Sequence, residues 1–277
     1  MPTSSKRNIV IEILKYTFLI IFGILALYPF VWILLSSFKN NPEIYGSPFS
    51  LPKVWRFENY ISAWSSAHIE TYFFNSIIIS FISVGITLLI SSMVSYVLSR
   101  IWNNMPMYTY FTLGIMIPPH VILIPLFILM RYLTLQDTRI SLIIIYSVGN
   151  LSLAIFTLVG FMKTLPKELE EAAIIDGCSL FRAFFKIILP LSKPGLATVG
   201  TLTFLNNWND YLFALVMISN PDLKTLTVGI ADLRGQYFTE YGPLCAGLVL
   251  AIVPVTIIYI LFQEQVIKGM TAGAVKG

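Results

Sequence analysis

Glu171-Ala172-Ala173-Ile174-Ile175-Asp176-Gly177 is a charged, helix-forming stretch that lies between two long apolar segments. After nine further residues the chain continues with Ile187-Ile188-Leu189-Pro190. Charged side chains are strongly disfavoured inside a bilayer, so we expect this stretch to lie in water, where another protein can reach it. The apolar segments on both sides then become membrane-spanning helices, and the stretch becomes part of the loop that joins them.

The composition extends this interpretation to the whole chain. Of the 277 residues, 56% are hydrophobic and only 12% are charged, which is far from the usual composition of soluble proteins. Apolar runs of about 20 residues, the length that spans a bilayer, recur along the sequence. They predict an all-α polytopic membrane protein with six transmembrane helices. The expected spans are about 12–36, 72–98, 107–130, 140–162, 195–218 and 243–265.

The distribution of basic residues predicts the orientation in the membrane. If both termini are cytosolic, eleven of the 18 Lys and Arg residues lie on the cytosolic side, as the positive-inside tendency favours. We therefore expect a multi-pass protein of the cell membrane with cytosolic N- and C-termini. The net charge of +4 is scattered along the chain, so the lipid bilayer is the expected partner and nucleic acid is not.

The loop between the fourth and fifth spans carries the local signals of two short helices. Pro166 suits the first turn of a helix, and the carboxylates that follow it lie near the positive end of the helix dipole. Gly177 can adopt the left-handed conformation that stops a helix. Ser179 can cap a second helix, which Pro190 is expected to end.

The order Glu-Ala-Ala-x2-Asp-Gly-x9-Ile-x-Leu-Pro resembles the coupling-loop motif of permease subunits in binding-protein-dependent ABC importers. Other stretches are similar to carbohydrate-importer permeases of the maltose type, in particular to the second, six-helix permease. These stretches are Ser36-Ser37-Phe38-Lys39, Asn59-Tyr60, Trp208-Asn209-Asp210-Tyr211-Leu212, Thr225-Leu226-Thr227-Val228-Gly229 and the tail Gly273-Ala274-Val275-Lys276-Gly277. The resemblance therefore covers nearly the whole chain.

This resemblance implies a type I ABC importer permease fold in a single transmembrane permease domain, 1–277. Within it, the core is expected at about 71–266 and the cytosolic coupling loop at about 163–193. The implied ATPase-coupling residues are Glu171, Ala172, Ala173, Asp176, Gly177, Ile187, Leu189 and Pro190.

The resemblance also implies the partners. They are a homologous second permease that completes a heterodimer, an ATPase dimer that binds the coupling loops, and an extracytoplasmic sugar-binding protein. In family members the C-terminal tail can reach the ATPase dimer, so Lys276 and Gly277 are expected to contribute there. The sequence contains no Gly-x4-Gly-Lys-Ser/Thr phosphate loop. We therefore expect no enzyme activity, cofactor or metal site in this chain, and we expect ATP and Mg²⁺ to bind the partner ATPase.

A second polar group lies in the fifth predicted span. Asn206, Asn209 and Asp210 share one face of an ideal helix, with Asn207 and Tyr211 beside it. An Asp at the bilayer centre costs roughly 2.5–3.5 kcal/mol, so it should face a cavity or a partner. Because amide and carboxylate groups suit sugar hydroxyls, these five residues are the candidate substrate path. Alternatively, they satisfy broken backbone in a neighbouring helix or pair with the second permease.

Two further features bear on this path. Pro118-Pro119-His120 should interrupt the third span, either beside a cavity or as a simple packing kink. His120 itself either lines the path or satisfies a backbone carbonyl. The loop at 219–242 is the candidate surface for docking the binding protein.

Three classes of function are compatible with a chain of this kind. The leading prediction is the permease subunit of an ATP-driven importer of a sugar or oligosaccharide. Glycerol phosphate or another polyol is the alternative cargo, although the neutral and acidic residues of the fifth span favour a neutral sugar. An ion-coupled secondary transporter would leave the Glu171–Pro190 stretch unexplained, and an intramembrane enzyme would need a nucleophile that the sequence does not offer.

Overall fold

The computed structural model describes residues 3–66, 68–234 and 239–274, and in these ranges every regular element is a helix. The all-α prediction is therefore confirmed. The tail residues Val275, Lys276 and Gly277 lie outside the described residues. The chain divides into two compact units. One is formed by Met1–Ile69 and Ile230–Leu250, and the other by Glu70–Gly229 and Ala251–Gly277.

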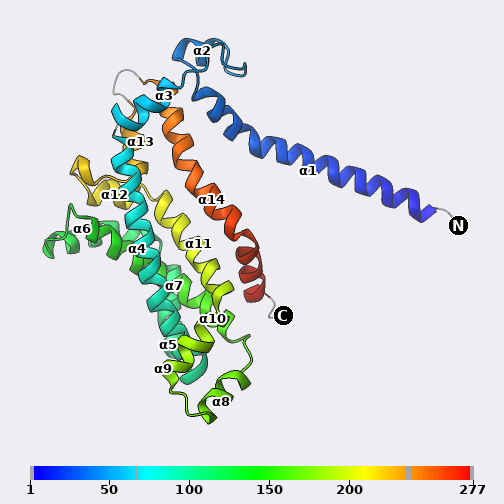
Figure 1. Cartoon of the computed structure of the whole chain (residues 1–277), viewed down its shortest axis with the longest axis vertical. Helices are drawn as coiled ribbons and strands as arrows, with labels where there is room; N and C mark the ends of the chain where they lie inside the picture. Colours follow the sequence, from blue (N-terminus) through cyan, green and yellow to red (C-terminus); the bar gives the residue numbers. More distant parts are fainter. Residues whose placement is uncertain (1–2, 67, 235–238, 275–277) are drawn as a thin grey trace. The chain divides into compact units, whose positions relative to one another are not determined.

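The first unit begins with the long helix α1 (Figure 1). Its helices are α1 (Thr3–Ser36), α2 (Asn41–Gly46), α3 (Glu58–Ile61), the π-helical turn η1 (Ser62–Ser66) and the first part of α14 (Tyr241–Ala274). The segment Ile11–Ser36 of α1 is long and apolar enough to cross a membrane, which confirms the predicted first span. None of its most apolar window is buried inside the structure, as expected for a surface that faces lipid.

Buried polar groups order the connection that follows α1. Asn59 Nδ2 donates to the carbonyl oxygens of Ser37 (2.8 Å) and Lys39 (3.0 Å), which lie just beyond the helix end. The buried Lys39 ammonium donates in turn to the carbonyls of Ser47 (3.1 Å) and Pro48 (3.3 Å). Helix ends leave carbonyls without intrahelical partners, and these side chains supply the missing donors. Two of the stretches that resemble the permease family, Ser36-Ser37-Phe38-Lys39 and Asn59-Tyr60, are therefore hydrogen-bonded to each other.

The second unit contains most of the remaining helices. They are α4 (Ile69–Tyr96), η2 (Val97–Ile101), α5 (Met105–Leu113), η3 (Gly114–Met116), η4 (Pro119–Ile122), α6 (Leu123–Tyr132), α7 (Arg139–Met162), α8 (Glu168–Ile175), α9 (Leu180–Ala183), η5 (Phe184–Ile188), α10 (Leu189–Leu191), α11 (Lys193–Asn209), α12 (Leu212–Met217), η6 (Pro221–Leu223) and α13 (Leu226–Asp232). Of these, α4, α7 and α11 run side by side (Figure 1).

Small polar residues hold α4 against α7. The hydroxyls of Ser83, Thr87 and Ser95 are buried and donate to carbonyls of α7 that lie 60 positions further along the chain in each case. A constant offset means that the two helices run parallel, as the second and fourth spans of an alternating topology must. Small residues allow helix backbones to approach closely in a membrane, and their hydroxyls add interhelical hydrogen bonds.

Helices α7 and α11 run antiparallel. Asn150 on α7 bonds to Asn207 on α11, and Tyr146, one turn earlier on α7, bonds to Asp210 just beyond the end of α11. Partner positions therefore rise on one helix as they fall on the other. This direction is the one expected for consecutive spans.

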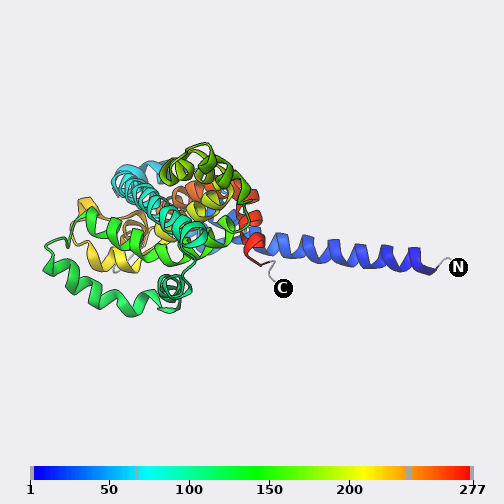
Figure 2. The ribbon, with the colours of Figure 1, turned by 90° about the horizontal axis from the view of Figure 1, so that it is seen from below.

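Two of the six predicted spans are bent. The third consists of Met105–Met116 and Pro119–Tyr132, which meet at 88°. In Figure 2 α6 runs across the view while α5 is seen end-on. The break falls at Pro118 and Pro119, as predicted, because proline removes a backbone donor and its ring clashes with the preceding turn.

The fifth span differs from the prediction at both ends. It consists of two apolar segments, Leu180–Leu191 and Lys193–Asn209, which meet at 74°. The second helix ends at Asn209, before the predicted end at 218. The expectation of one helix across 195–218 is therefore wrong. The other four predicted spans correspond to Ile11–Ser36, Ile69–Ile101, Arg139–Met162 and Tyr241–Gln265. With each bent pair counted as one span, the described residues provide six.

Candidate functional site

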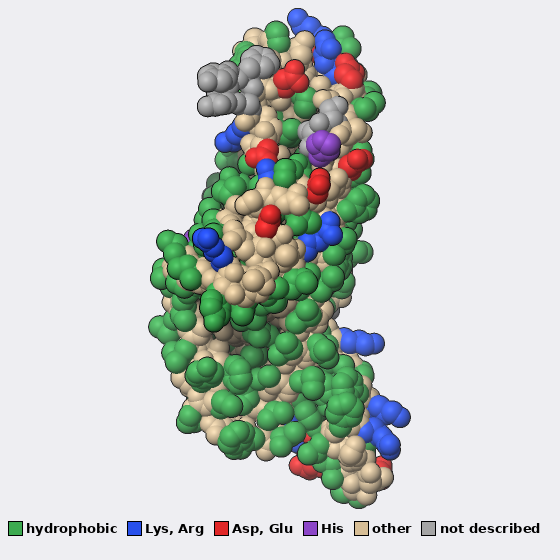
Figure 3. All heavy atoms as spheres, turned by 90° about the vertical axis from the view of Figure 1, so that its left-hand side faces the viewer, with side chains coloured by type: hydrophobic (Ala, Val, Ile, Leu, Met, Phe, Trp, Pro, Cys, Tyr) green, Lys and Arg blue, Asp and Glu red, His purple; other side chains and the backbone are tan. Residues whose placement is uncertain are grey.

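The 163–193 segment forms the predicted pair of short helices. Helix α8 carries Glu168, Glu170 and Glu171 in its first turn, where the helix dipole favours negative charge. Together with α9 it lies at the end of the second unit, beyond α5 (Figure 1). Figure 3 shows Lys, Arg, Asp and Glu side chains gathered at this end of the unit, below a face covered mainly by hydrophobic side chains.

Glu170 fastens α8 to the end of α4. Its side chain is only 8% exposed and accepts a hydrogen bond from the hydroxyl of Tyr96. The Tyr96 ring packs against Phe184, with 5.1 Å between the ring centroids. A helix of eight residues is not stable alone in water, so this anchor contributes to keeping α8 folded. Tyr96 was not among the residues predicted from the sequence, because its partner Glu170 lies 74 positions away.

Arg100 holds the end of α7 beside this anchor. Its Nη2 donates to the carbonyl oxygens of Met162 (2.6 Å) and Leu165 (2.7 Å). Met162 is the last residue of α7 and Leu165 lies three residues beyond it, so Arg100 brings a positive charge to the C-terminal end of the helix, where it is favourable. Arg100 belongs to η2, which continues α4, so its two bonds tie both the end of α7 and the start of the 163–193 segment to the end of α4.

The turn between α8 and α9 has the predicted geometry. Gly177 adopts a positive φ of 81°, and the amide of Cys178 donates to the carbonyl of Ala173 (2.9 Å) across the helix end. Glycine is favoured there because a Cβ is strained in the left-handed region. The Ser179 hydroxyl accepts from the amide of Arg182 (3.4 Å) and caps α9. These two predictions are confirmed.

Pro190 does not end the second helix, so that prediction is wrong. The chain continues through the π-helical turn η5 and α10 to Leu191, and the 74° bend follows there. A proline ring clashes with the carbonyl four residues before it in a regular α-helix. The wider π turn directly before Pro190 offers the physical reason why the helix tolerates it.

The residues of the family motif divide between an outer and an inner face. Glu171, Ala172, Asp176, Gly177 and Pro190 are exposed. Ala173, Ile187 and Leu189 are partly buried, and the last two pack with Ile188 and Phe184 under the Tyr96 anchor. The outer face also presents Ile175, which is 86% exposed. The segment thus presents a small apolar surface rimmed by charge.

The second candidate site lies where α11 stops. Asp210 is extended (φ −65°, ψ 135°), and its Oδ2 accepts from the Tyr146 hydroxyl (2.7 Å) and from the amide of Ala214 in α12 (3.1 Å). Aspartate competes in this way for backbone donors and so favours helix ends over helix interiors. The predicted continuous stripe through Asp210 is therefore interrupted, and Tyr146 is a residue that the sequence did not reveal.

Asparagines connect this helix end to α7. Asn206 Nδ2 donates to Asn150 Oδ1 (3.0 Å), and Asn150 Nδ2 donates to Asn207 Oδ1 (2.9 Å) and to the carbonyl of Tyr146 (2.7 Å). Asn206, Asn209 and Tyr211 are exposed, whereas Asn207 is buried. The structure thus brings three of the predicted path residues to an accessible surface, and gives Asn207 and Asp210 bonds within the protein.

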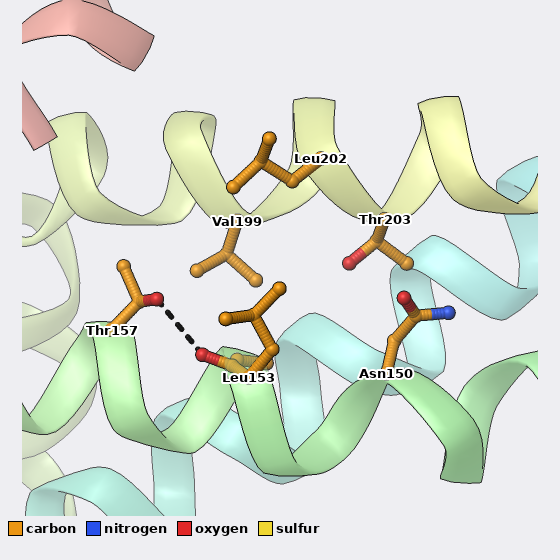
Figure 4. A pocket seen from close by; sticks show the side chains of 7 residues that line it. Asn150, Leu153, Thr157, Val199, Leu202 and Thr203 are labelled. Carbon is orange, nitrogen blue, oxygen red and sulfur yellow. Dashed lines mark hydrogen bonds between the residues drawn. The ribbon is translucent and has the colours of Figure 1, made fainter. Parts of the chain in front are cut away.

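A small pocket lies between α7 and α11 near these asparagines (Figure 4). Its lining includes Asn150, Leu153, Thr157, Val199, Leu202 and Thr203. The cavity volume of about 10 Å³ is close to what one water molecule needs, and far below the roughly 300 Å³ of a small-molecule site. Among the described residues no three His, Cys, Asp or Glu side chains gather as metal ligands would. His120 is exposed.

Together these features define a multi-pass helical membrane protein with bent spans and a helix–turn–helix segment built on the ends of α4 and α7. Residues 88–271 match the family of binding-protein-dependent transport system inner membrane components, and the chain belongs to this family. It is a transport permease.

Two relatives and one solved structure illustrate the match. The chain is 36% identical to the diacetylchitobiose uptake system permease protein NgcG of Streptomyces coelicolor, over 94% of this chain and 87% of that protein. It is 35% identical to the trehalose/maltose transport system permease protein MalG of Thermococcus litoralis, over 96% and 99%. A bacterial ABC transporter involved in the import of alginate contains a chain of the same fold, with a TM-score of 0.84, 24% identity and coverage of 95% and 99%. The type I ABC importer permease fold is thus confirmed.

Proposed function

We propose that this chain is the permease subunit of an ATP-binding-cassette importer that moves a sugar or oligosaccharide into the cell. In this proposal a separate ATPase dimer docks on the 163–193 segment and binds ATP and Mg²⁺. The observation that carries the proposal is the exposed helix–turn–helix, which the Tyr96–Glu170 and Arg100 contacts fasten to α4 and α7. A surface fixed to two spans can transmit a displacement from a docked protein into the membrane.

The outer face of this segment has the chemistry of a docking surface. Ile175 offers apolar area, and Glu171 and Asp176 beside it are exposed carboxylates. Apolar side chains rimmed by charged groups are typical of protein interfaces. The residues proposed to face the ATPase are therefore Glu171, Ala172, Asp176 and Gly177. The other residues of the motif are proposed to hold this face in place, from the inner side of the segment or from the turn that follows: Ala173, Ile187, Leu189 and Pro190.

The cargo is inferred from two observations. The relatives described above are named for uptake of diacetylchitobiose and of trehalose or maltose. The accessible polar groups at the α11 end are amides and a phenol, Asn206, Asn209 and Tyr211, which can both donate to and accept from sugar hydroxyls. Because the pocket beside these asparagines has a volume of only about 10 Å³, the path is proposed to be completed by a homologous second permease.

The remaining assignments follow from this arrangement. The chain is proposed to act as one permease domain with cytosolic termini, so that the 163–193 segment faces the cytosol. An extracytoplasmic sugar-binding protein is proposed to deliver the cargo at the opposite side, where the 219–242 loop would lie.

Labelled uptake tests this function directly. Cells that lack the chain, cells that carry it and cells that carry Glu171→Arg are compared across a panel of labelled mono- and oligosaccharides. We expect uptake of at least one sugar to depend on the chain, and Glu171→Arg to abolish that uptake without loss of the protein from the membrane. Glu70→Arg, the same charge reversal at an exposed position on α4, should leave uptake intact. No dependence of any panel sugar on the chain would refute the cargo assignment.

A further inference from the structure

The 219–227 segment is held in place by side chains from two other parts of the second unit. Asp137, in the turn before α7, accepts with Oδ1 from the amides of Ser219 (2.9 Å) and Asn220 (2.8 Å). Its own amide donates to the carbonyl of Met217 (2.9 Å). Asp137 adopts a positive φ of 61°, a conformation that Asp tolerates better than most residues. The start of the segment is thereby fixed to the turn that leads into α7.

Helix α4 holds the middle of the same segment. Asn75 Nδ2 donates to the carbonyls of Asp222 (2.9 Å) and Lys224 (3.0 Å), and Ser76 Oγ accepts from the amide of Leu226 (2.8 Å). Asn75 is itself oriented by Arg139, whose Nε donates to Asn75 Oδ1 (2.9 Å). Asn75 and Ser76 are both buried. Backbone groups fixed by buried side chains make this segment a rigid body, unlike an ordinary exposed loop.

The end of the segment reaches the break in the fifth span. Thr227 Oγ1 donates to the carbonyl of Asp210 (2.5 Å). The Asp210 carboxylate simultaneously accepts from Tyr146 of α7 and from the amide of Ala214 in α12. Asp210 therefore joins α7, α11, α12 and the 219–227 segment. One residue before it is the exposed Asn209, and one turn before it is the exposed Asn206.

We propose that Asp210, with Tyr146 and Thr227, is a positioning junction that sets where the end of α11 presents Asn206 and Asn209, according to the position of the 219–227 segment. Asp210 then acts through its neighbours and is not a sugar ligand. This inference rests on the proposed function for its physiological meaning: a docking protein that displaces the segment together with the parts of α4 and α7 bonded to it would, through Asp210, move the polar end of the path. The contacts on which it depends lie within this chain and involve no partner protein.

The two roles of Asp210 predict different behaviour of its neighbours. If Asp210 contacted sugar, Tyr146→Phe and Thr227→Val would matter little, and Asp210 variants would change the KM for particular sugars. If Asp210 positions the helix end, Tyr146→Phe reproduces the effect of Asp210→Ala, because Tyr146 is a donor to the carboxylate. Thr227→Val should also shift the helix end, because it removes the bond to the Asp210 main-chain carbonyl. Asp210→Asn retains an oxygen that can accept from Tyr146 and Ala214, so it should be the mildest change at this position.

Cysteine labelling measures the position of the helix end without knowledge of the cargo. Asn209→Cys is introduced into the full chain with Cys178→Ser and Cys245→Ser, and its reaction rate with a membrane-impermeant maleimide is measured in membranes. We expect Tyr146→Phe and Thr227→Val each to change this rate about fivefold, in the same direction. Loss of one buried hydrogen bond shifts the equilibrium between the held and the displaced helix end by about this factor. Tyr132→Phe, on a ring that is 84% exposed, and Thr157→Val, whose hydroxyl bonds within its own helix, should leave the rate unchanged.

Unchanged labelling in both junction variants would overturn the proposal. It would also be overturned if Asp210→Asn changed the KM of one transported panel sugar while Tyr146→Phe and Thr227→Val transported normally. If Asp210→Ala fails to insert, the two conservative variants still decide. Failure of the proposed function looks different: no panel sugar depends on the chain, while the labelling rates still respond to the junction variants.

Discussion

Tyr96→Phe removes one hydroxyl from the anchor between α4 and the 163–193 segment and leaves its packing in place. The ring contact with Phe184 is retained, because the ring makes it and the hydroxyl does not. What is lost is the hydrogen bond to Glu170, which is 8% exposed, from a tyrosine that is 4% exposed. The longer contact of the same hydroxyl with the Leu180 carbonyl (3.5 Å) is lost with it. Leaving a buried polar group without its partner costs about 1–3 kcal/mol. The ratio of attached to released α8 should therefore fall by a factor of about 5–150.

Hydrogen exchange of the permease in lipid nanodiscs measures this ratio. Amides of α8 exchange when the helix is released, so their exchange should accelerate by the same factor, while amides of α7 keep their protection. Glu170→Gln keeps an oxygen that accepts from Tyr96 and should have a smaller effect. Tyr110→Phe, on an exposed ring, is the matched control. Equal protection of α8 in Tyr96→Phe and the unmodified chain would refute the anchor.

Three further experiments probe other contacts. Gly177→Ala puts a Cβ at a φ of 81°, which costs roughly 1–2 kcal/mol. Limited proteolysis should therefore cleave the 163–193 segment of this variant faster. An unaltered cleavage rate would show that alanine is not strained in this turn. Gly229→Ala would place a Cβ 1.9 Å from Tyr72 Cδ2, and such overpacking costs about 1–3 kcal/mol. Its thermal unfolding temperature should fall, whereas Gly149→Ala, which meets open space, should not lower it. Asn150→Ala and Asn207→Ala can be combined in a double-mutant cycle on the free energy of unfolding. The coupling energy should be about 0.6 kcal/mol, which is typical of interhelical hydrogen bonds in membranes. If the two effects on the free energy of unfolding are strictly additive, the bond is not supported.

Local chemistry made the 163–193 segment predictable. Its signals are the carboxylates after Pro166, the glycine at position 177 and the cap at Ser179. Each of them acts on backbone only a few residues away, so the order of residues in the sequence is sufficient to predict the two helices and the turn. The apolar spans were predictable for the same reason, since their length and composition alone match the bilayer. Pro118 and Pro119 likewise marked the break in the third span correctly.

Contacts between distant residues were not predictable. Asp210 was expected inside a helix, but it ends one because Tyr146, 64 positions earlier, donates to its carboxylate. Tyr96 and Glu170 are 74 positions apart, so neither residue alone indicated the anchor. No prediction was made for Ser83, Thr87 and Ser95 of α4, because their role depends on α7 carbonyls that lie 60 positions further along the chain. Pro190 was assigned the end of a helix because the π turn before it has no sequence signature.

Site-specific photo-crosslinking at Ile175 tests most directly whether the 163–193 segment docks an ATPase. A benzoylphenylalanine at this position, which is 86% exposed, is irradiated in intact cells, and the products are identified by mass spectrometry. Tyr132, on α6 and 84% exposed, is the matched control position. Docking predicts a crosslink from position 175 to a subunit that contains an ATP-binding phosphate loop, and none from position 132. A fully incorporated probe at position 175 that captures no such subunit in transporting cells would contradict it.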